Sequence, residues 1–393
     1  MGKIINTLKN INWKYYLNYI VVFAVGLVFT LLTTFGDLKI ATLFLLEKIL
    51  ISIILAVSLS LVVGFLGELS LGHAGFMCVG AYFGGIVSML FDLNGTGIIK
   101  GDGVLSFIIS LVVGAAAAGI CGFIIGLPAL RLKGDYLAIV TLAFCEIIKT
   151  LFENFTFKMG DQTVGGPIGI KTPRFDKEYL FIIGFILVLI TLAVLQNLIR
   201  SKHGRAITAI RDNEIAAHAT GINVTKYKLV GFVISAVFAG AAGVFYSFAN
   251  ATVSASVFDY NYSIEILVMV VLGGMGNITG TMISATLITF LNIQLQSVLT
   301  GDFAVLKDII YALILIIVII YNNTPMLKGF REKYNFKKLY KKILSIFNKN
   351  KNHYADDEGE WARVPTKIDM NELLSTDFIV NESTKDADKG GKE

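Results

Sequence analysis

The sequence is poor in charged residues, in cysteine and in histidine. Lys, Arg, Asp and Glu together make up 16% of the 393 residues, whereas a typical soluble domain contains roughly 25%. Cys78, Cys121 and Cys145 all lie in apolar stretches, which is typical of small buried side chains and not of a disulfide framework. The four histidines are scattered along the chain, so we expect no metal site.

Motifs of common catalytic and nucleotide-binding sites are missing as well. The chain contains no G-x-x-x-x-G-K-[ST] loop, so we expect it to bind no ATP through a P-loop. It contains neither an H-E-x-x-H zinc motif nor a G-x-S-x-G nucleophile elbow. We therefore expect no enzymatic activity, no catalytic residues, no bound cofactor and no nucleic-acid partner.

Long apolar stretches dominate what is present, because 55% of the residues are hydrophobic. An α-helix needs about 20 predominantly apolar residues to cross a bilayer, so these stretches predict an all-α, polytopic membrane protein with about ten transmembrane helices. The eighth is short and runs into the sequence GGMGN, so we expect a broken or partial helix there. The predicted spans are residues 16–35, 41–65, 74–91, 104–129, 135–153, 179–199, 228–249, 263–276, 279–299 and 304–321.

The positions of Lys and Arg predict the orientation, because basic residues accumulate in cytoplasmic connections. They precede the first span, separate the fourth from the fifth, and follow the sixth and the last. With an even number of spans these positions all lie on one side, so both termini are predicted to be cytoplasmic. The residues concerned are Lys3, Lys9, Lys14, Arg131, Lys133, Arg200, Lys202, Arg205 and the basic run from Lys328.

Composition divides the chain into four segments. We interpret residues 1–15 as a cytoplasmic N-terminus and residues 16–321 as a transmembrane domain with a cytoplasmic loop at 200–227. Residues 322–350 are basic and amphipathic, which is typical of a helix lying on anionic lipid. Residues 351–393 are mostly acidic and too poor in apolar residues to form a core, so we expect a disordered tail.

Glycine interrupts the apolar sequence in both halves of the chain. In Val62–Gly85 the glycines stand beside Glu68, Ser70 and His73, and in Leu272–Met282 they include Gly273, Gly274 and Gly276. Paired broken segments are typical of a substrate site at the middle of the membrane in transporters. Close helix packing near the cytoplasmic face is the alternative interpretation of the first segment.

Two predicted spans contain carboxylates. Glu47 stands next to Lys48, and Glu146 follows Thr141 in AIVTLAFCEIIKTLF. Ionisable groups within the membrane often line a substrate or proton path. The alternative for Glu146 is local pairing with Lys149 at i,i+3, and Glu47 with Lys48 is equally compatible with a position near an interface.

The loop TVGGPIGI predicts a tight and defined turn, because it combines a proline with several glycines. The predicted topology places this loop on the external side. There it either forms a rim that contacts a partner or substrate, or is an ordinary structured turn. The rim would consist of Thr163, Gly165, Gly166 and Gly169.

The stretch from Arg200 to Lys228 is polar, although predicted spans flank it on both sides. Ile207, Ile210 and the Glu214–Ile215 region recur near helical spacing, which predicts a short amphipathic helix from about Arg205. Asp212 or Asn213 is suited to cap a second short helix, with Glu214 in its first turn.

Small residues and a terminating glycine follow in the second helix. Ala216, Ala217 and Ala219 favour helix and add little bulk, and Gly221 supplies the left-handed position at which helices often end. A helix that lies on lipid usually buries Trp, Phe or Leu, and this one has none. We therefore interpret the segment as a rigid element that docks a soluble cytoplasmic partner.

These residues also carry a family resemblance. Glu214-Ile215-Ala216-Ala217 followed by Gly221 is similar to the "EAA…G" loop of ATP-binding-cassette importer permeases, which seats in a groove of the ATPase subunit. More narrowly, the chain resembles the branched-chain amino acid permease family, in particular the larger of its two paralogous membrane subunits. The matching stretches are GELSLGHAGFMCVGAY, DYLAIVTLAFCEIIK, TVGGPIGI, GRAITAIRDNEIAAHATGINVTKYK, FVISAVFAGAAGVFYS and SIEILVMVVLGGMGNITG.

The resemblance implies a multi-pass protein of the bacterial plasma membrane that imports branched-chain amino acids. Its partners would be a paralogous permease, two ATP-binding subunits that hold ATP and Mg²⁺, and an external solute-binding protein. Residues 204–221 would couple it to the ATPases, through Gly204, Arg205, Arg211, Glu214, Ala216, Ala217 and Gly221. From the glycine breaks and the polar residues within the spans, we expect the substrate pathway to involve Glu68, Ser70, His73, Thr141, Glu146, Gly273, Gly274 and Gly276.

The chain departs from the family pattern in two places. Ser284 stands where a glycine is common, and the tail after Lys351 lies outside the family core. Close relatives carry urea or short amides, so the substrate stays open at this stage. A secondary transporter or channel that works without ATPases is the alternative in a different functional class.

Overall fold

The protein is described by a computed structural model that covers residues 22–24, 26–30, 33, 40–93, 103–132, 134–159, 162–172, 177–250, 252–298, 309, 312–313 and 316. The chain divides into two compact units, Met1–Asn323 and Thr324–Glu393, and every described residue belongs to the first. The predicted spans 16–35 and 304–321 fall largely outside the described residues. The basic segment 322–350 and the tail 351–393 lie outside them completely.

The described part of the chain is mostly helical, which confirms the predicted class. Six of its helices are long and apolar enough to cross a membrane. They are α3 (Ile40–Ser60) continued by the π-helix η1 (Leu61–Leu66), α4 (His73–Leu93), α5 (Val104–Ala129), α7 (Lys177–Arg200), α10 (Val224–Ala249) and α12 (Ile278–Val298).

Two further predicted spans form helices outside this set. The prediction for 135–153 corresponds to α6 (Asp135–Asn154), which is long enough but carries Glu146 and Lys149 together with an acidic residue at either end. The eighth span, expected to be short, is α11 (Tyr260–Gly273) with 14 residues. At about 1.5 Å per residue, a helix of this length covers only part of a bilayer.

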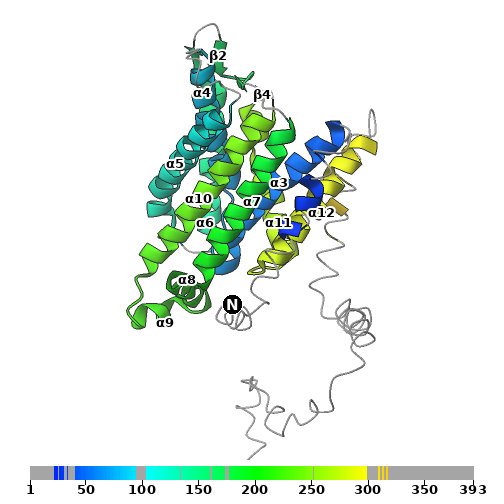
Figure 1. Cartoon of the computed structure of the whole chain (residues 1–393). Helices are drawn as coiled ribbons and strands as arrows, with labels where there is room; N and C mark the ends of the chain where they lie inside the picture. Colours follow the sequence, from blue (N-terminus) through cyan, green and yellow to red (C-terminus); the bar gives the residue numbers. More distant parts are fainter. Residues whose placement is uncertain are drawn as a thin grey trace, which may run out of the picture. The chain divides into compact units, whose positions relative to one another are not determined.

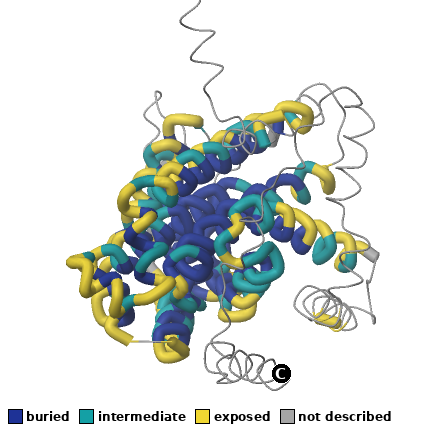
Figure 2. The backbone as a smooth tube through the Cα atoms, turned by 90° about the horizontal axis from the view of Figure 1, so that it is seen from below, coloured by how far each residue is buried: buried dark blue, intermediate teal, exposed yellow. Residues whose placement is uncertain are grey.

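Helix α10 packs against α4, α5 and α3 (Figure 1). Figure 2 shows the buried residues gathered in the interior of the bundle. Glycine permits close contact between these helices, because a Cβ added at Gly80 of α4 would lie 2.5 Å from the Cα of Gly240 in α10. Helices α5 and α12 are instead largely exposed, with apolar side chains such as Ile120 and Leu287 on their outer faces. A helix that is apolar all round is typical of a membrane environment.

The two ends of the bundle carry different elements (Figure 1). One end carries two short helices, α8 (Lys202–Asp212) and α9 (Glu214–Ala219). The opposite end carries short strands in two antiparallel pairs, which places the predicted docking element and the predicted rim at opposite ends. The strands are β1 (Thr156–Met159) with β2 (Gln162–Gly165) and β3 (Ile170–Lys171) with β4 (Thr252–Val253), and the 3-10 helix η2 (Ala255–Val257) follows β4.

Both predicted glycine breaks are present. The first begins where η1 ends at Gly67, whose left-handed φ of 79° does not continue a helix. Residues 67–72 are irregular until α4 begins. The second is the turn Gly274–Asn277 between α11 and α12. The π-helical geometry of η1 was not predicted, because widened turns of this kind have no recognisable hydrophobic period.

Candidate functional site

Helix α8 begins three residues earlier than predicted. The helix starts at Lys202 because the Ser201 hydroxyl caps it, accepting a hydrogen bond from the Gly204 amide at 3.3 Å. The prediction of a start near Arg205 was therefore wrong, since it followed the apolar period and overlooked the serine. Within the helix Gly204 is buried, whereas Arg205 is exposed at the end of the bundle.

Helix α9 has the predicted start and stop. The side chain of Asn213 accepts a hydrogen bond from the Ala216 amide at 3.0 Å, so Asn213, one of the two predicted caps, is the one that acts. Gly221 has a φ of 84°, a conformation that is strained for residues with a Cβ. The Ile222 amide then donates to the Ala217 carbonyl, which closes the end of the helix.

The two helices do not share one continuous apolar face. Ile207 and Ile210 of α8 are buried as predicted, and Ala217 is buried in α9. Ile215, however, is 82% exposed, so the apolar spacing that begins with Ile207 and Ile210 does not continue as one buried face. The extended backbone at Asn213 (φ −159°) interrupts the helical phase between the two segments.

Helix α9 therefore presents an apolar surface away from the bundle. Ala216 and Ala219 are exposed beside Ile215, and a shallow hollow lies along the same helix. We call this exposed surface, formed by Ile215, Ala216 and Ala219, the α9 face. The hollow is lined by Glu214, Ile215, His218, Ala219, Val224 and Thr225.

Arg211 connects α8 to both glycine breaks. Its Nη1 donates to the carbonyl oxygen of Gly64 in η1 at 2.9 Å, while Nε and Nη2 donate to Asp212. Gly64 in turn lies against Gly276, because a Cβ added at Gly64 would stand 2.5 Å from the Gly276 amide nitrogen. The two breaks predicted from glycine thus meet beside α8.

The second break lies at the α8–α9 end of the bundle. Arg211 of α8 contacts the break at Gly276. The cause is the short α11, which begins beside α4, where Ser263 accepts a hydrogen bond from the Ala74 amide. The helix then runs toward α8 and ends at Gly273 and Gly274.

Lys228, which the sequence did not single out, binds two carboxylates. Its ammonium group lies 2.6 Å from Glu68 and 3.4 Å from Glu214. The Lys228 side chain is only 4% exposed, whereas those of Glu68 and Glu214 are 12% and 37% exposed. Glu68 of the first break and Glu214 of α9 are therefore held by one buried cation. The only signal in the sequence is a lysine one turn inside an apolar helix.

The predicted pathway residues next to Glu68 are packed among helices. The Thr141 hydroxyl accepts a hydrogen bond from the Leu71 amide at 2.9 Å and so fixes the break against α6. His73 is buried, with Nε2 at 3.3 Å from the Ser58 hydroxyl and 3.1 Å from that of Ser235. Ser70 is buried as well. These contacts bring the predicted residues together around the break.

Glu146 makes the predicted local pair. Its Oε2 lies 3.0 Å from the Lys149 ammonium group, and its Oε1 accepts a hydrogen bond from the Tyr260 amide at the start of α11. Glu146 thereby joins α6 to α11. In α3, Glu47 is buried, and the Lys48 ammonium lies 4.1 Å from the centre of the Tyr246 ring, a distance typical of a cation–π contact.

The loop at the opposite end is a defined turn, as predicted. Gly165, Gly166 and Gly169 all have φ values between 73° and 88°, and Gly165 pairs with Gly169 in an isolated bridge. Thr163 lies opposite Lys158 in the β1–β2 register. The backbone conformation of this loop therefore depends on glycine at three positions.

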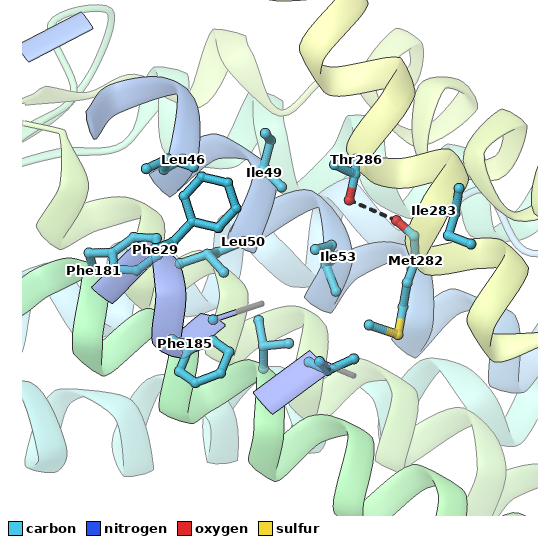
Figure 3. A pocket seen from close by; sticks show the side chains of 13 residues that line it. Phe29, Leu46, Ile49, Leu50, Ile53, Phe181, Phe185, Met282, Ile283 and Thr286 are labelled. Atoms are coloured by element: carbon cyan, nitrogen blue, oxygen red, sulfur yellow. Dashed lines mark hydrogen bonds between the residues drawn. The ribbon is translucent and has the colours of Figure 1, made fainter. Parts of the chain in front are cut away.

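An apolar cavity lies between the described residues 22–30 and helices α3, α7 and α12 (Figure 3). Phe29, Phe181 and Phe185 contribute rings to it, and the Thr286 hydroxyl on its wall donates to the Met282 carbonyl at 2.9 Å. Among the described residues, the lining offers no charged side chain to a polar solute. This cavity therefore does not fit the ammonium and carboxylate groups of an amino acid.

Comparisons with known proteins find related transport permeases. Residues 41–319 match the family described as "Branched-chain amino acid transport system / permease component". The chain is 33% identical over 312 residues to the high-affinity branched-chain amino acid transport system permease protein LivM of Salmonella typhimurium, covering 71% of this chain and 68% of the relative. For LivM of Escherichia coli K12 the identity is 34% over 285 residues, which covers 64% of this chain and 62% of the relative.

A more distant similarity broadens the comparison. The ribose import permease protein RbsC of Escherichia coli K12 is 28% identical over 327 residues, covering 81% of this chain and 86% of the relative. No solved structure matches the chain. The family match covers most of the chain, including both glycine breaks and the α8–α9 segment. This chain therefore belongs to the family of permease components of branched-chain amino acid transport systems.

Proposed function

We propose that the chain is the translocation subunit of an ATP-driven importer for branched-chain amino acids, and that the loop from Gly204 to Gly221 couples it to ATPase subunits. The observation that carries the proposal is the α8–α9 segment. It is capped at Ser201 and Asn213, ends at Gly221, and presents the α9 face away from the bundle. Exposed apolar residues on a rigid protrusion are typical of a docking site.

The inner contacts of the same segment support a role in transmission. Arg211 binds the Gly64 carbonyl, and Glu214 binds Lys228, so the loop contacts the helices on which a pathway would depend. ATP binding and hydrolysis in the partner subunits would move α8 and α9 and so switch the bundle between two states. Arg205 and Ala216 are exposed and would contact the ATPase.

The remaining partners follow from the two ends of the bundle. With about ten spans, both termini and the α8–α9 segment would face the cytoplasm, and the turn of Gly165, Gly166 and Gly169 would face outward toward a solute-binding protein. A paralogous permease would complete the pathway, and Mg²⁺ and ATP would bind only to the ATPases. Residues 322–350 would lie on anionic lipid, with 351–393 as a cytoplasmic tail.

The substrate assignment to branched-chain amino acids is supported by the family and by the two LivM relatives. The predicted pathway residues cluster around the first break, where Thr141 binds Leu71 and His73 contacts Ser58. We propose that this region moves during transport. A pathway for urea, short amides or a sugar is an alternative within the same kind of importer.

The experiment is uptake into proteoliposomes that contain the complete complex. We expect radiolabelled leucine to enter only with ATP, and competition by unlabelled valine but not by urea or ribose. The Glu214→Lys variant should hydrolyse ATP with little uptake, because a positive charge at 214 would be repelled by Lys228. Normal uptake by this variant would contradict the coupling role, and gradient-driven uptake by the chain alone would favour a secondary transporter.

A further inference from the structure

We propose that Lys228 is a positioning residue that transmits the movement of α9 to the irregular segment 67–72. Its ammonium group lies between Glu214 of α9 and Glu68 of the segment. The inference rests on the proposed function, since it concerns the route by which the docked loop acts on the pathway. Neither the family match nor the relatives assign a role to this lysine.

The first link joins α9 to α10. Glu214 is the first residue of α9, and its carboxylate lies 3.4 Å from the Lys228 ammonium. Glu214 is 37% exposed, so its side chain is accessible at the surface that carries the α9 face. A displacement of α9 therefore changes the distance between these two charges.

The second link joins Lys228 to the break. The distance to Glu68 is 2.6 Å and both side chains are largely buried, so this ion pair is stronger and less screened than the first. Glu68 directly follows Gly67, where the chain leaves the helix with a φ of 79°. The Glu68 amide donates to the Val62 carbonyl of η1 at 3.1 Å, so a force on the Glu68 carboxylate acts where the chain leaves η1 for the irregular segment.

The segment beyond Glu68 leads to the predicted pathway. Two residues after Glu68 comes the buried Ser70, the Leu71 amide binds Thr141, and α4 begins at His73 beside Ser58 and Ser235. A shift of Glu68 would therefore move the start of α4 relative to α3, α6 and α10. Such a segment, with two ends fixed and glycine at its hinge, is suited to two discrete arrangements.

Lys228 is placed to change partners. Its single ammonium group faces the carboxylates of Glu68 and Glu214, so these two carboxylates compete for it. Any event that draws Glu214 away from Lys228 leaves the ammonium to Glu68 alone. Arg211 makes the neighbouring contact to the Gly64 carbonyl, but its charge is already bound to Asp212. Among the described ion pairs, those of Lys228 are the ones that join α9 to the break.

The test is hydrogen–deuterium exchange on the complete complex in nanodiscs, with and without ATP. In the wild type we expect ATP to change the exchange of both 202–219 and 67–72. In Lys228→Met the ATP-dependent change in exchange at 202–219 should persist. The ATP-dependent change in exchange at 67–72 and the uptake per ATP hydrolysed should each fall about tenfold. This effect lies within the range of about 5- to 150-fold that is typical of coupling between sites.

Two variants serve as controls. Lys226→Met removes the same charge from an exposed position two residues away, and we expect wild-type exchange and uptake. Lys228→Arg keeps the cation and should restore coupling to within a few-fold. If Lys228→Met fails to assemble, Glu68→Gln tests the same link, because it keeps the shape of the side chain. In this variant we also expect ATP to change the exchange of 202–219 but not that of 67–72.

The outcomes separate the inference from the proposed function. Equal ATP-dependent changes at 67–72 in the wild type, Lys228→Met and Glu68→Gln would overturn the transmission role of Lys228. That role is equally overturned if 67–72 does not respond in the wild type while 202–219 does. In both cases the docking of α8–α9 would stand. If the exchange of 202–219 itself changes neither with the ATPase subunits nor with ATP, the proposed function is contradicted instead.

Discussion

The ammonium group of Lys228 lies 2.6 Å from a carboxylate oxygen of Glu68, a residue 160 positions away in the sequence. Both side chains are largely buried, at 4% and 12% exposure. The pair joins the start of α10 to the first glycine break, and Glu214 of α9 approaches the same lysine from the surface. The proposed docking element and the proposed pathway therefore share one ion-pair cluster.

The first prediction concerns the stability of this cluster. Lys228→Ala leaves the Glu68 carboxylate buried without its partner, which costs about 3 to 5 kcal/mol of unfolding free energy. The double variant Lys228→Met with Glu68→Leu should recover much of this loss, because apolar residues of similar size replace both charges. Reversible unfolding in mixed detergent micelles measures both values, and additive losses in the double variant would show that the charges act independently.

The second prediction concerns Arg211 and the contact between the two breaks. Arg211→Gln removes the hydrogen bond to the Gly64 carbonyl, and a charged hydrogen bond of this kind contributes about 1.5 to 3 kcal/mol before allowance for its exposure. We expect uptake to fall several-fold while the ATPases remain bound. Arg131→Gln, an exposed arginine at the end of another helix, should leave uptake unchanged, and an equal loss in both variants would contradict the assignment.

The third prediction concerns the end of α9. Gly221→Val places a β-branched residue at a φ of 84°, which costs about 1 to 2 kcal/mol, and should shift α9 and reduce ATP-driven uptake. Gly221→Asn should be milder, because asparagine tolerates the left-handed region. Uptake assays on both variants test this order, and a valine variant as active as the asparagine variant would show that the turn does not determine coupling.

The fourth prediction concerns the α9 face. Ile215→Asp changes a side chain that is 82% exposed, so the melting temperature should stay close to that of the wild type, since such surface changes stay within about 0.5 kcal/mol. Co-purification with the ATPase subunits should nevertheless be lost, because the aspartate would have to be desolvated in an apolar groove.

A matched variant at the other end of the bundle provides the control. Ile168 is 71% exposed in the turn of Gly165, Gly166 and Gly169. Ile168→Asp should keep the ATPases bound and weaken only the effect of the solute-binding protein. If Ile215→Asp still co-purifies with the ATPases, the α9 face is not the docking surface.

The sequence predicts those features that depend on near neighbours. Asn213 and Gly221 were identified as a cap and a stop because their hydrogen bonds and backbone angles are local. The turn at Gly165, Gly166 and Gly169 was predicted for the same reason. Long helices such as α5, found over the predicted residues 104–129, follow directly from hydrophobic length.

Features that depend on distant contacts or on helix phase were not predicted. Lys228 looks like an isolated basic residue near the start of α10, since the spacing of 160 residues gives no indication that Glu68 lies beside it. The exposure of Ile215 depends on the extended backbone at Asn213, which breaks the helical period. Ser284, identified only as a departure from the family pattern, binds the Met269 carbonyl and so joins α12 to α11.

The most direct test of coupling through α8 and α9 measures leucine uptake and ATP hydrolysis together, in proteoliposomes that contain the complete complex. We predict ATP-dependent uptake by the wild type and, for Gly221→Val, ATP hydrolysis that continues while uptake falls. The same ratio of leucine transported to ATP hydrolysed in both proteins, or leucine uptake by the wild type without ATP, would contradict this coupling.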